Sequence, residues 1–338
     1  MTVVVTGAAG FIGGHVVDAL LGRGEHVVAL DRRPLGSLSS AAAGASPFPA
    51  GRRSGGSLRF FAADLADVQP ADAAGTALTD ADAVIALAGC GGVRDTGADI
   101  AVRRTRDNVE SVRRTLALVR PGVPVVVASS SSVYGGSRSG RASRETAALV
   151  PRGGYAASKS AAEAVCRTFR EQGRSVTVVR PFTVAGENQR SDMALSRWIA
   201  AAAAGLPLTV YGSMERTRDV TDVRAVARCL LALLDRDPAT TVNIGTGVGH
   251  TLRTLTAAVG RAVGTPVTVQ LHPCHPDDVS DTLADTTRLE RLVGFRPVTD
   301  LDELLVRQAT AQLEGAAPAG EQDPNRPAEH EPAGTAVA

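Results

Sequence analysis

The amino-acid sequence predicts an α/β protein with a doubly wound parallel sheet, helices on both faces, and a smaller C-terminal α/β domain. Short β-branched runs alternate with helical stretches through the first two thirds of the chain, the pattern of βαβ units. A glycine-rich turn follows the first run directly. The chain has 338 residues, 44% of them hydrophobic, which is enough for a substantial core.

Each element of this fold has its own signal. Runs rich in β-branched residues and bounded by turn residues predict strands. Apolar residues at helical spacing predict helices over 11–21, 109–119 and 155–171, the last ended by Gly173. The expected strands are 3–5, 26–30, 58–61, 83–86, 123–129, 176–180 and 241–244.

Two segments have the composition of unpacked chain. Residues 36–57 are rich in Ser, Gly and Pro, which predicts a surface insertion after the second strand. Residues 316–338 lack apolar periodicity, which predicts a disordered tail.

Charge and composition exclude several classes of function. A formal net charge of +1 argues against a nucleic-acid partner. No apolar run is long enough to span a membrane, and a strand follows Met1 directly, so we expect a cytoplasmic protein. The His272-Pro-Cys274-His275 stretch lacks the second ligand pair of a structural zinc site, so we expect no metal.

The glycine-rich turn predicts a dinucleotide site of the Rossmann type. Gly7, Gly10 and Gly13 stand three residues apart, with Phe11 and Ile12 between the last two. Glycines permit a tight turn and a close approach of the backbone to a pyrophosphate at the helix N-terminus. The motif lies between a strand and an amphipathic helix, which is the context that supports this function.

Residues after the second and third strands indicate which dinucleotide binds. Asp31 ends the second strand, where a carboxylate accepts the ribose hydroxyls and repels a 2′-phosphate. Arg32 and Arg33 could instead accommodate NADP, but Asp31 favours NAD. Asp64 and Leu65 are expected at the adenine edge, with a helix N-cap as an equal alternative for Asp64.

Tyr155 and Lys159 form the candidate acid/base pair. Their spacing puts both side chains on one helix face. A free phenol has a pKa of about 10 and is a poor base at neutral pH. A neighbouring ammonium group favours the phenolate, which allows Tyr155 to act as a general acid/base on a substrate hydroxyl.

With these motifs in order, the chain resembles the extended short-chain dehydrogenase/reductases of the NAD-dependent epimerase/dehydratase family from residue 2 to about 310. The resemblance implies a catalytic hydroxyl at Ser130 and an active-site Asn at Asn108. It adds Leu87, Ala88 and Ser129 to the cofactor-binding residues. It also implies an NAD-binding domain of residues 1–184 and 219–247, and a substrate-binding domain of 185–218 and 248–315.

Within that family the chain is most similar to UDP-glucuronate 4-epimerases. The similarity is carried by three stretches, 92–94 (GVR), 128–135 (ASSSSVYG) and 182–194 (FTVAGENQRSDMA). The related 4,6-dehydratases and uronate decarboxylases have Glu where this chain has Ser132, which argues against both reactions.

This resemblance implies how the UDP-sugar is held. Ser131, Ser132 and Thr183 match the positions that hold the uronate carboxylate, and Arg190 is a further substrate contact. The guanidinium groups of Arg94 and Arg218 suit the pyrophosphate. Asp278 completes the expected substrate residues.

Alternative functions remain open on sequence alone. A UDP-glucose 4-epimerase, or a 4-ketoreductase or dehydratase of another nucleotide sugar, would use the same acid/base pair. A non-catalytic NAD-sensing regulator would be expected to lose Tyr155 or Lys159, and both are present. The helices over 109–119 and 155–171 resemble the pair that forms a family dimer interface, so we expect a homodimer.

Overall fold

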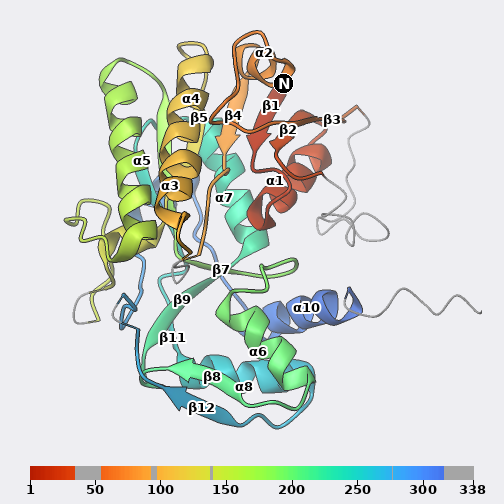
Figure 1. Cartoon of the computed structure of the whole chain (residues 1–338), viewed down its shortest axis with the longest axis vertical. Helices are drawn as coiled ribbons and strands as arrows, with labels where there is room; N and C mark the ends of the chain where they lie inside the picture. The colour runs from red at the N-terminus through yellow and green to blue at the C-terminus, as the bar shows by residue number, and fades with distance from the viewer. Residues whose placement is uncertain (35–54, 93–96, 138–139, 276, 316–338) are drawn as a thin grey trace, which may run out of the picture.

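The structure, a computed structural model, describes residues 1–34, 55–92, 97–137, 140–275 and 277–315. Within these residues a seven-stranded sheet has the order β10-β6-β5-β4-β1-β2-β3, and all its neighbouring strands run parallel (Figure 1). Its strands are β1 (Thr2–Thr6), β2 (His26–Asp31), β3 (Ser57–Ala62), β4 (Ala83–Ala86), β5 (Val125–Ala128), β6 (Val176–Pro181) and β10 (Thr241–Ile244).

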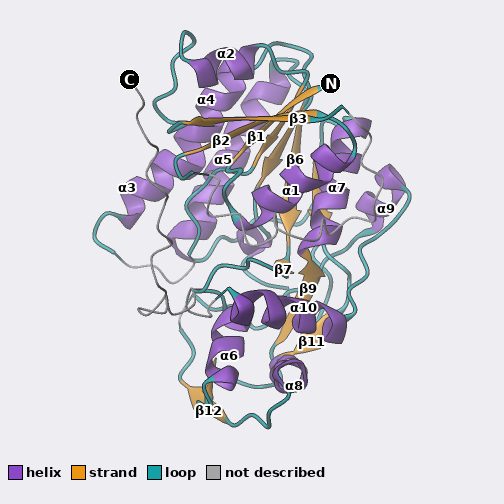
Figure 2. Cartoon of the chain, turned by 90° about the vertical axis from the view of Figure 1, so that its right-hand side faces the viewer, coloured by secondary structure: helices purple, strands orange, loops and turns teal. Residues whose placement is uncertain are grey.

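Helices cover both faces of this sheet (Figure 2). Successive residues of β1 show why, because Val3 and Val5 belong to one buried cluster while Val4 belongs to another. Sheets buried on both faces favour such unbroken apolar strands. One face packs against α1 (Phe11–Gly22), α7 (Val223–Arg236) and α9 (Thr287–Val293), and the other against α2 (Ala73–Thr79), α4 (Ser111–Leu118) and α5 (Gly153–Glu171).

The expected helix over 109–119 is part of a longer helical segment. It begins as α3 (Ile100–Arg104), widens into the π-helical turn η2 (Thr105–Glu110), and continues as α4. Such π turns are rare and concentrate at functional sites. The sequence prediction therefore missed the first nine helical residues, whose buried members Arg104, Asp107 and Asn108 are polar, so that the segment carries little apolar periodicity.

A smaller unit lies below the sheet in Figures 1 and 2. It has its own buried cluster, built around Trp198, Ile199 and Leu304. Its helices are α6 (Ala194–Ala203), α8 (Leu252–Val263) and α10 (Leu301–Glu314). Its strands are β7 (Thr183–Ala185), β9 (Thr217–Asp222) and β11 (Gly249–Thr251) in one sheet, and β8 (Leu208–Tyr211) and β12 (Val269–His272) in another.

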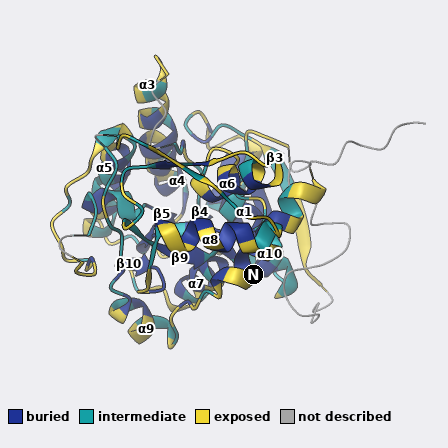
Figure 3. Ribbon diagram, turned by 90° about the horizontal axis from the view of Figure 1, so that it is seen from below, coloured by how far each residue is buried: buried dark blue, intermediate teal, exposed yellow. Residues whose placement is uncertain are grey.

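Helix α8 illustrates how the sequence encodes this smaller unit. Thr251 caps its first turn by accepting a hydrogen bond from the Thr254 amide at 3.0 Å, and Gly264 ends the helix with φ +75°. Leu252, Leu255 and Val259 form its buried side. Figure 3 shows the resulting buried and exposed faces of α8.

Three sequence predictions differ from the structure in detail. The fifth strand is shorter than 123–129, because Val123 belongs to a turn and Ser129 lies beyond the last strand residue, although its amide still bonds to Val179. Leu289 of α9 packs into a core cluster of the large sheet, so the segment 248–315 does not pack wholly in the smaller unit. Ser57 begins β3, whereas most of the expected insertion and the expected tail at 316–338 lie outside the described residues.

No helix in the described part of the chain is long and apolar enough to span a membrane.

Candidate active site

The glycine-rich turn after β1 forms a cradle that only glycine fits. Gly7 has φ +68°, and a Cβ added to it would lie 2.6 Å from the Ala88 amide nitrogen. A Cβ on Gly13 would lie 2.1 Å from the Gly7 carbonyl oxygen. Gly10 precedes the first turn of α1, which has no side-chain cap and no acidic residue. The free amide groups of this first turn of α1 therefore place the positive end of the helix dipole where an anion can bind.

The other residues expected near this cradle lie around it. Phe11 and Ile12 are half-buried in the first turn of α1. Leu87 and Ala88 follow β4, and their amides donate to the carbonyl and the hydroxyl of Thr6 at 3.1 and 3.3 Å. The cradle is thus lined by the carboxyl ends of β1 and β4, where ligands of such sheets bind.

Asp31 ties the end of β2 to the glycine turn. One carboxylate oxygen accepts from the Ala9 amide at 3.0 Å, and the other accepts from the Arg33 amide at 2.9 Å. The Arg33 guanidinium donates back to the Ala9 carbonyl at 2.8 Å. A carboxylate therefore stands next to the cradle, with its two oxygens held in fixed positions.

Arg32 and Asp64 lie in a cluster of charges beside this site. Arg32 donates to Asp107 at 2.8 Å and to Asp64 at 3.3 Å, while Arg106 lies 2.6 Å from Asp64. Burial tends to raise the pKa of Asp64, but the bonds from Arg106 and the Ala66 amide together with the charges of Arg106 and Arg32 outweigh it, and the pKa is lowered. Asp64 is not a helix N-cap, because Asp72 precedes α2, so that alternative was wrong. Leu65 next to it is buried.

Ser130, Tyr155 and Lys159 come together at the end of β5. Lys159 is buried on α5 and donates to the Ala128 carbonyl oxygen at 2.9 Å. Burial lowers the pKa of Lys159 to about 8. Burial raises the pKa of Tyr155, and a hydrogen bond with Ser130 opposes this rise. The chain thus holds a phenol, a hydroxyl and an ammonium group within one small region.

The segment 89–92 crosses this region and is held by Asn108. Asn108 is fully buried, accepts from the Cys90 amide at 2.9 Å, and donates to the Cys90 carbonyl at 3.0 Å and the Ser158 hydroxyl at 2.9 Å. A Cβ on Gly89 would lie 2.5 Å from the Asn108 amide oxygen and 3.3 Å from Lys159 Nζ. Glycine at this position therefore lets the loop pass between the two side chains.

Arg190 reaches the same segment from the smaller unit. A Cβ on Gly91 would lie 1.9 Å from its Nη1, so the guanidinium lies directly against this loop. Arg190 also pairs with Asp192, with 2.9 Å between Nε and Oδ1, and its side chain is 46% exposed. The positive charge of Arg190, like the Ser130 hydrogen bond, opposes the rise that burial causes in the pKa of Tyr155.

The remaining serines of the 129–132 run have distinct surroundings. The Ser129 hydroxyl donates to Glu163 at 2.5 Å, beneath the region expected to bind the cofactor. Ser130 accepts from the Ser132 amide at 3.2 Å and begins a short 3-10 turn, η3 (Ser131–Tyr134). The Ser132 hydroxyl is buried and has no hydrogen-bond partner among the described residues. Ser131 and Thr183 of β7 are both half-buried.

The expected pyrophosphate residues lie around the segment 278–284. Arg218 donates to the carbonyls of Val279 and Ser280 at 3.0 and 2.9 Å. The Asp278 amide bonds to the His275 carbonyl at 3.0 Å. Arg94 lies outside the described residues.

Two buried charged residues make contacts that sequence reasoning missed. Asp219 is fully buried and binds the amides of Thr246, Gly247 and Ala284 at 2.9 to 3.0 Å, so it ties the smaller unit to the end of β10. Arg104 is buried beside the 89–92 segment. A carboxylate at 219 and a run of arginines at 103–106 were visible, but nothing in a single sequence gives their distant partners.

Sequence reasoning also missed a cluster in contact with Ser129, which we call the Tyr134 cluster: Tyr134, Glu163, Arg180 and Asn243. Arg180 and Glu163 are joined at 2.6 Å, and Arg180 Nη1 donates to the Tyr134 hydroxyl at 2.8 Å. Tyr134 donates to Asn243 Oδ1 at 2.7 Å. Burial raises the pKa of Tyr134.

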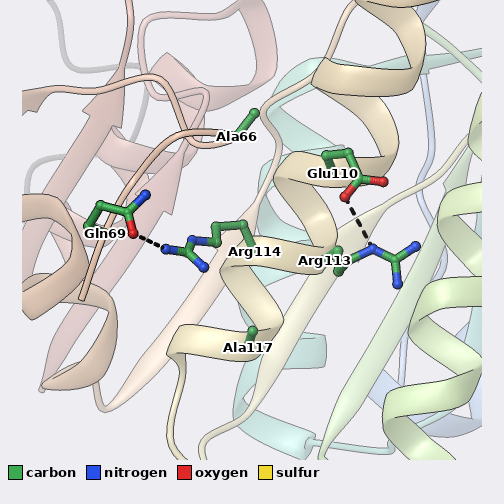
Figure 4. Close-up of a pocket in the computed structure, with 6 residues that line it drawn as sticks. All are labelled: Ala66, Gln69, Glu110, Arg113, Arg114 and Ala117. Atoms are coloured by element: carbon green, nitrogen blue, oxygen red, sulfur yellow. Dashed lines mark hydrogen bonds and ion pairs between the residues drawn. The ribbon is translucent and has the colours of Figure 1, made fainter.

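A separate hollow in the described part of the chain lies away from the acid/base residues. Figure 4 shows this hollow of about 330 Å³ between the turn at 66–69 and the outer side of α4. Arg114 there donates to Gln69 at 2.7 Å, and Arg113 to Glu110 at 3.2 Å. In the part of the chain that the structure describes, no group of three or more His, Cys, Asp or Glu could hold a metal ion.

Comparison with known proteins identifies relatives over most of the chain. Residues 3–245 match the NAD dependent epimerase/dehydratase family. A protein of Bacillus subtilis described as an uncharacterized UDP-glucose epimerase is 28% identical over 317 residues, covering 91% of this chain and 96% of that protein. A probable UDP-glucuronate 4-epimerase of Rhizobium meliloti is 28% identical over 340 residues, covering 91% of this chain and 95% of its own length.

Solved protein structures are also similar to this chain over most of its length. MoeE5 in complex with UDP-glucuronic acid and NAD superposes with a TM-score of 0.80 at 33% identity, over 93% of this chain and 100% of that one. The same protein has been solved with UDP-glucose and NAD, and it matches with the same score and identity.

Proposed function

The chain belongs to the NAD-dependent epimerase/dehydratase family, and on that premise we propose that it is an NAD-dependent UDP-sugar 4-epimerase interconverting UDP-glucuronate and UDP-galacturonate. One observation carries the choice of sugar. The buried hydroxyl of Ser132, which has no partner among the described residues, lies two residues from Ser130 and close to the Tyr155 acid/base site. Neutral donors there suit a carboxylate, whereas the dehydratases and decarboxylases that the chain resembles carry Glu at this position.

NAD is the cofactor, and the glycine cradle fits it. Gly7, Gly10 and Gly13 would face its pyrophosphate across the uncapped first turn of α1, and Asp31 would accept the adenosine ribose hydroxyls. We propose that the other residues assigned to the cofactor from the sequence also bind NAD. When bound, NAD supplies a hydride acceptor and donor, so the sugar can be oxidised and reduced again without net redox change.

Tyr155 would move the proton. In the proposed reaction it takes the proton of the sugar 4-hydroxyl, assisted by the Ser130 hydroxyl, while the C4 hydride would pass to NAD. After the 4-keto sugar has turned over, the hydride would return to the other face of C4 and Tyr155 would return the proton to the C4 oxygen. The Lys159 ammonium group lies one helix turn away and favours the phenolate over the phenol. The rotated keto sugar would be reduced to the galacto epimer at the same position.

A uronate substrate also requires that its carboxylate is not lost as carbon dioxide during the reaction. Oxidation at C4 produces a β-keto acid, which loses carbon dioxide when the carboxylate is oriented toward the ring carbonyl. Ser131, Ser132 and Thr183 would hold the carboxylate with neutral hydroxyl groups, and Arg190 would add a charged contact. The ring could then turn over while the carboxylate remains bound.

The nucleotide end of the substrate would lie toward the smaller unit. We propose that Arg94 and Arg218 bind the pyrophosphate, with Asp278 nearby. Arg218 would exchange its hydrogen bonds to the 279–280 carbonyls for phosphate oxygens. We further propose a cytoplasmic homodimer that pairs through α4 and α5, as the family resemblance implies.

A neutral UDP-hexose is the alternative substrate, as for a UDP-glucose 4-epimerase or a related reductase. It is favoured by the relative described as a UDP-glucose epimerase and by Arg190, which already pairs with Asp192 at the surface. The same acid/base residues would serve either sugar.

Separate incubation with UDP-glucuronate and UDP-glucose decides between them. The products are resolved as epimers by chromatography, and bound nucleotide is identified by mass spectrometry of the purified protein. We expect bound NAD and at least tenfold higher kcat/KM for UDP-glucuronate. Turnover of the neutral sugar alone would contradict the uronate assignment, and Ser132→Ala should then leave its rate unchanged.

A further inference from the structure

Arg104 has a charged side chain that is almost completely buried. It is the last residue of α3 and directly precedes the π turn η2, and only 6% of its surface is exposed. Its neighbour Arg103 on the same helix is exposed. Burying a guanidinium is unfavourable unless its donors are satisfied and its charge is used or compensated.

The contacts of Arg104 join two segments of the active site. Its Nη2 donates to the Gly92 carbonyl oxygen at 2.5 Å. A Cβ on Gly154 would lie 2.8 Å from its Nη1, so the guanidinium lies against the first turn of α5. Tyr155 is the next residue of that turn. Glycine at 154 is thus what lets the guanidinium approach the turn that carries the phenol.

Asn108, four residues further along the same helical segment, makes a matching pair of contacts. It binds the backbone of Cys90 at the other end of the short loop and Ser158 one turn further along α5. The α3–η2 segment therefore holds the loop at Cys90 and Gly92, and holds α5 on both sides of Tyr155.

Among the described residues, the charged and titratable groups that act on the Tyr155 phenol come from several elements. Arg190 comes from the smaller unit, Cys90 from the loop and Arg104 from α3, and the Ser130 hydroxyl comes from the end of β5. Lys159 lies on α5 itself and bonds to a backbone carbonyl. Arg104 differs from Arg190 in its burial, because only 6% of Arg104 is exposed whereas the Arg190 side chain is 46% exposed.

We propose that Arg104 is a positioning residue that clamps Gly92 to the first turn of α5 and keeps a permanent positive charge beside the Tyr155 hydroxyl. This inference rests on the proposed function only in taking Tyr155 as the acid/base group. It assigns Arg104 two effects, one on the geometry of the loop and one on the ionisation of the phenol.

The ionisation can be measured without turnover. The chain has three tyrosines, so the tyrosinate absorbance at 295 nm of the holoprotein, minus that of Tyr155→Phe, follows Tyr155 alone. Loss of a nearby positive charge is worth about one pKa unit or more. We expect Arg104→Gln to raise the Tyr155 titration midpoint by about one unit and Arg104→Lys to keep it within about 0.3 unit.

Turnover provides the second readout. Arg104→Gln should lower kcat about tenfold at pH 7.5, because a smaller fraction of Tyr155 is ionised, and should move the pH profile of kcat upward by about one unit. Arg103→Gln on the exposed side of α3 is the matched control and should change neither readout. If Arg104→Gln does not fold, Arg104→Lys carries the test, because it keeps the charge and loses the planar fork.

Three results would overturn the proposal. They are an unshifted Tyr155 titration in Arg104→Gln, an equal shift in Arg103→Gln, and a Lys variant that titrates like the Gln variant. Failure of the proposed function gives a different pattern, since the titration would still shift while no UDP-sugar is epimerised by the unaltered protein.

Discussion

Helix α5 contributes to two clusters that each combine a tyrosine with buried cations, and the two are connected differently. In the Tyr134 cluster the cation meets a carboxylate, with Arg180 and Glu163 at 2.6 Å. The phenol is bonded on both sides, to Arg180 at 2.8 Å and Asn243 at 2.7 Å. Around Tyr155 the buried ammonium of Lys159 instead donates to a neutral carbonyl at 2.9 Å.

From this difference we infer that the Tyr134 cluster stabilises the fold, whereas the Tyr155 region serves proton transfer. In the Tyr134 cluster the ion pair is buried and the phenol hydroxyl is hydrogen-bonded on both sides, so no group remains to bind a substrate. The cluster therefore stabilises the packing of η3, α5 and β6. Cations that bond to backbone leave their charge available to a developing phenolate, which suits proton transfer at Tyr155. The predictions below change one cluster at a time and measure both stability and turnover.

Tyr155→Phe should have the largest effect. It removes the group proposed to carry the proton, so kcat should fall about 10³- to 10⁴-fold. The fold and bound NAD should remain, because the phenol hydroxyl is not part of the Tyr134 cluster. Steady-state kinetics with thermal melts checks this, and more than a tenth of the original kcat would refute the assignment.

Arg180→Met tests the other cluster. It leaves Glu163 buried without its cation, so the free energy of unfolding should fall by about 3–5 kcal/mol. The kcat of the folded protein should change less than twofold. Arg253→Met is the matched control, because its pair with Glu215 is 67% and 64% exposed and worth at most about 1 kcal/mol. Equal losses of stability in the two variants, measured by urea unfolding, would contradict this role.

Lys159 gives the Tyr155 region a stability that depends on pH between about 8 and 10. Burial lowers its pKa to about 8, whereas the unfolded chain keeps a value of about 10.4. Between these values the unfolded state binds more protons, so stability from this residue is low below pH 8 and rises toward pH 10, by at most about 3 kcal/mol.

Urea unfolding of nucleotide-free protein at pH 7 and pH 10 measures this rise, and Lys159→Met should remove it. The same rise in the Met variant would show that other groups cause it.

Tyr134→Phe should have the smallest effect. It removes one hydroxyl from a bonded network and leaves Arg180 and Asn243 to find other partners, at a cost of about 1–2 kcal/mol. Turnover should be unchanged within twofold, in contrast to Tyr155→Phe. A large loss of kcat with intact stability would show that the two tyrosines share the chemistry.

The sequence predicted the fold class, the family and the cofactor, because these depend on local patterns. Alternating strands and helices and the glycines at 7, 10 and 13 are each readable within a few residues. The expected site residues Ser130, Tyr155 and Lys159 lie together, and their roles stay predictions.

The rest depends on distant contacts that no local pattern encodes. Arg104 and Gly154 are 50 positions apart in the numbering, and Arg180 meets Glu163 from a different element. From a single sequence, a buried arginine is indistinguishable from a surface arginine, because its contacts are formed only in the folded structure. The packing of α9 against the large sheet was missed for the same reason.

Conversion of UDP-glucuronate deuterated at C4 tests most directly whether the Tyr155 site epimerises a uronate through a 4-keto sugar. The product is analysed by proton NMR and mass spectrometry. We predict UDP-galacturonate that retains deuterium at C4, with no release of carbon dioxide, and no product from Tyr155→Phe. A UDP-pentose, a product that has lost the label, or conversion of UDP-glucose alone would contradict the account.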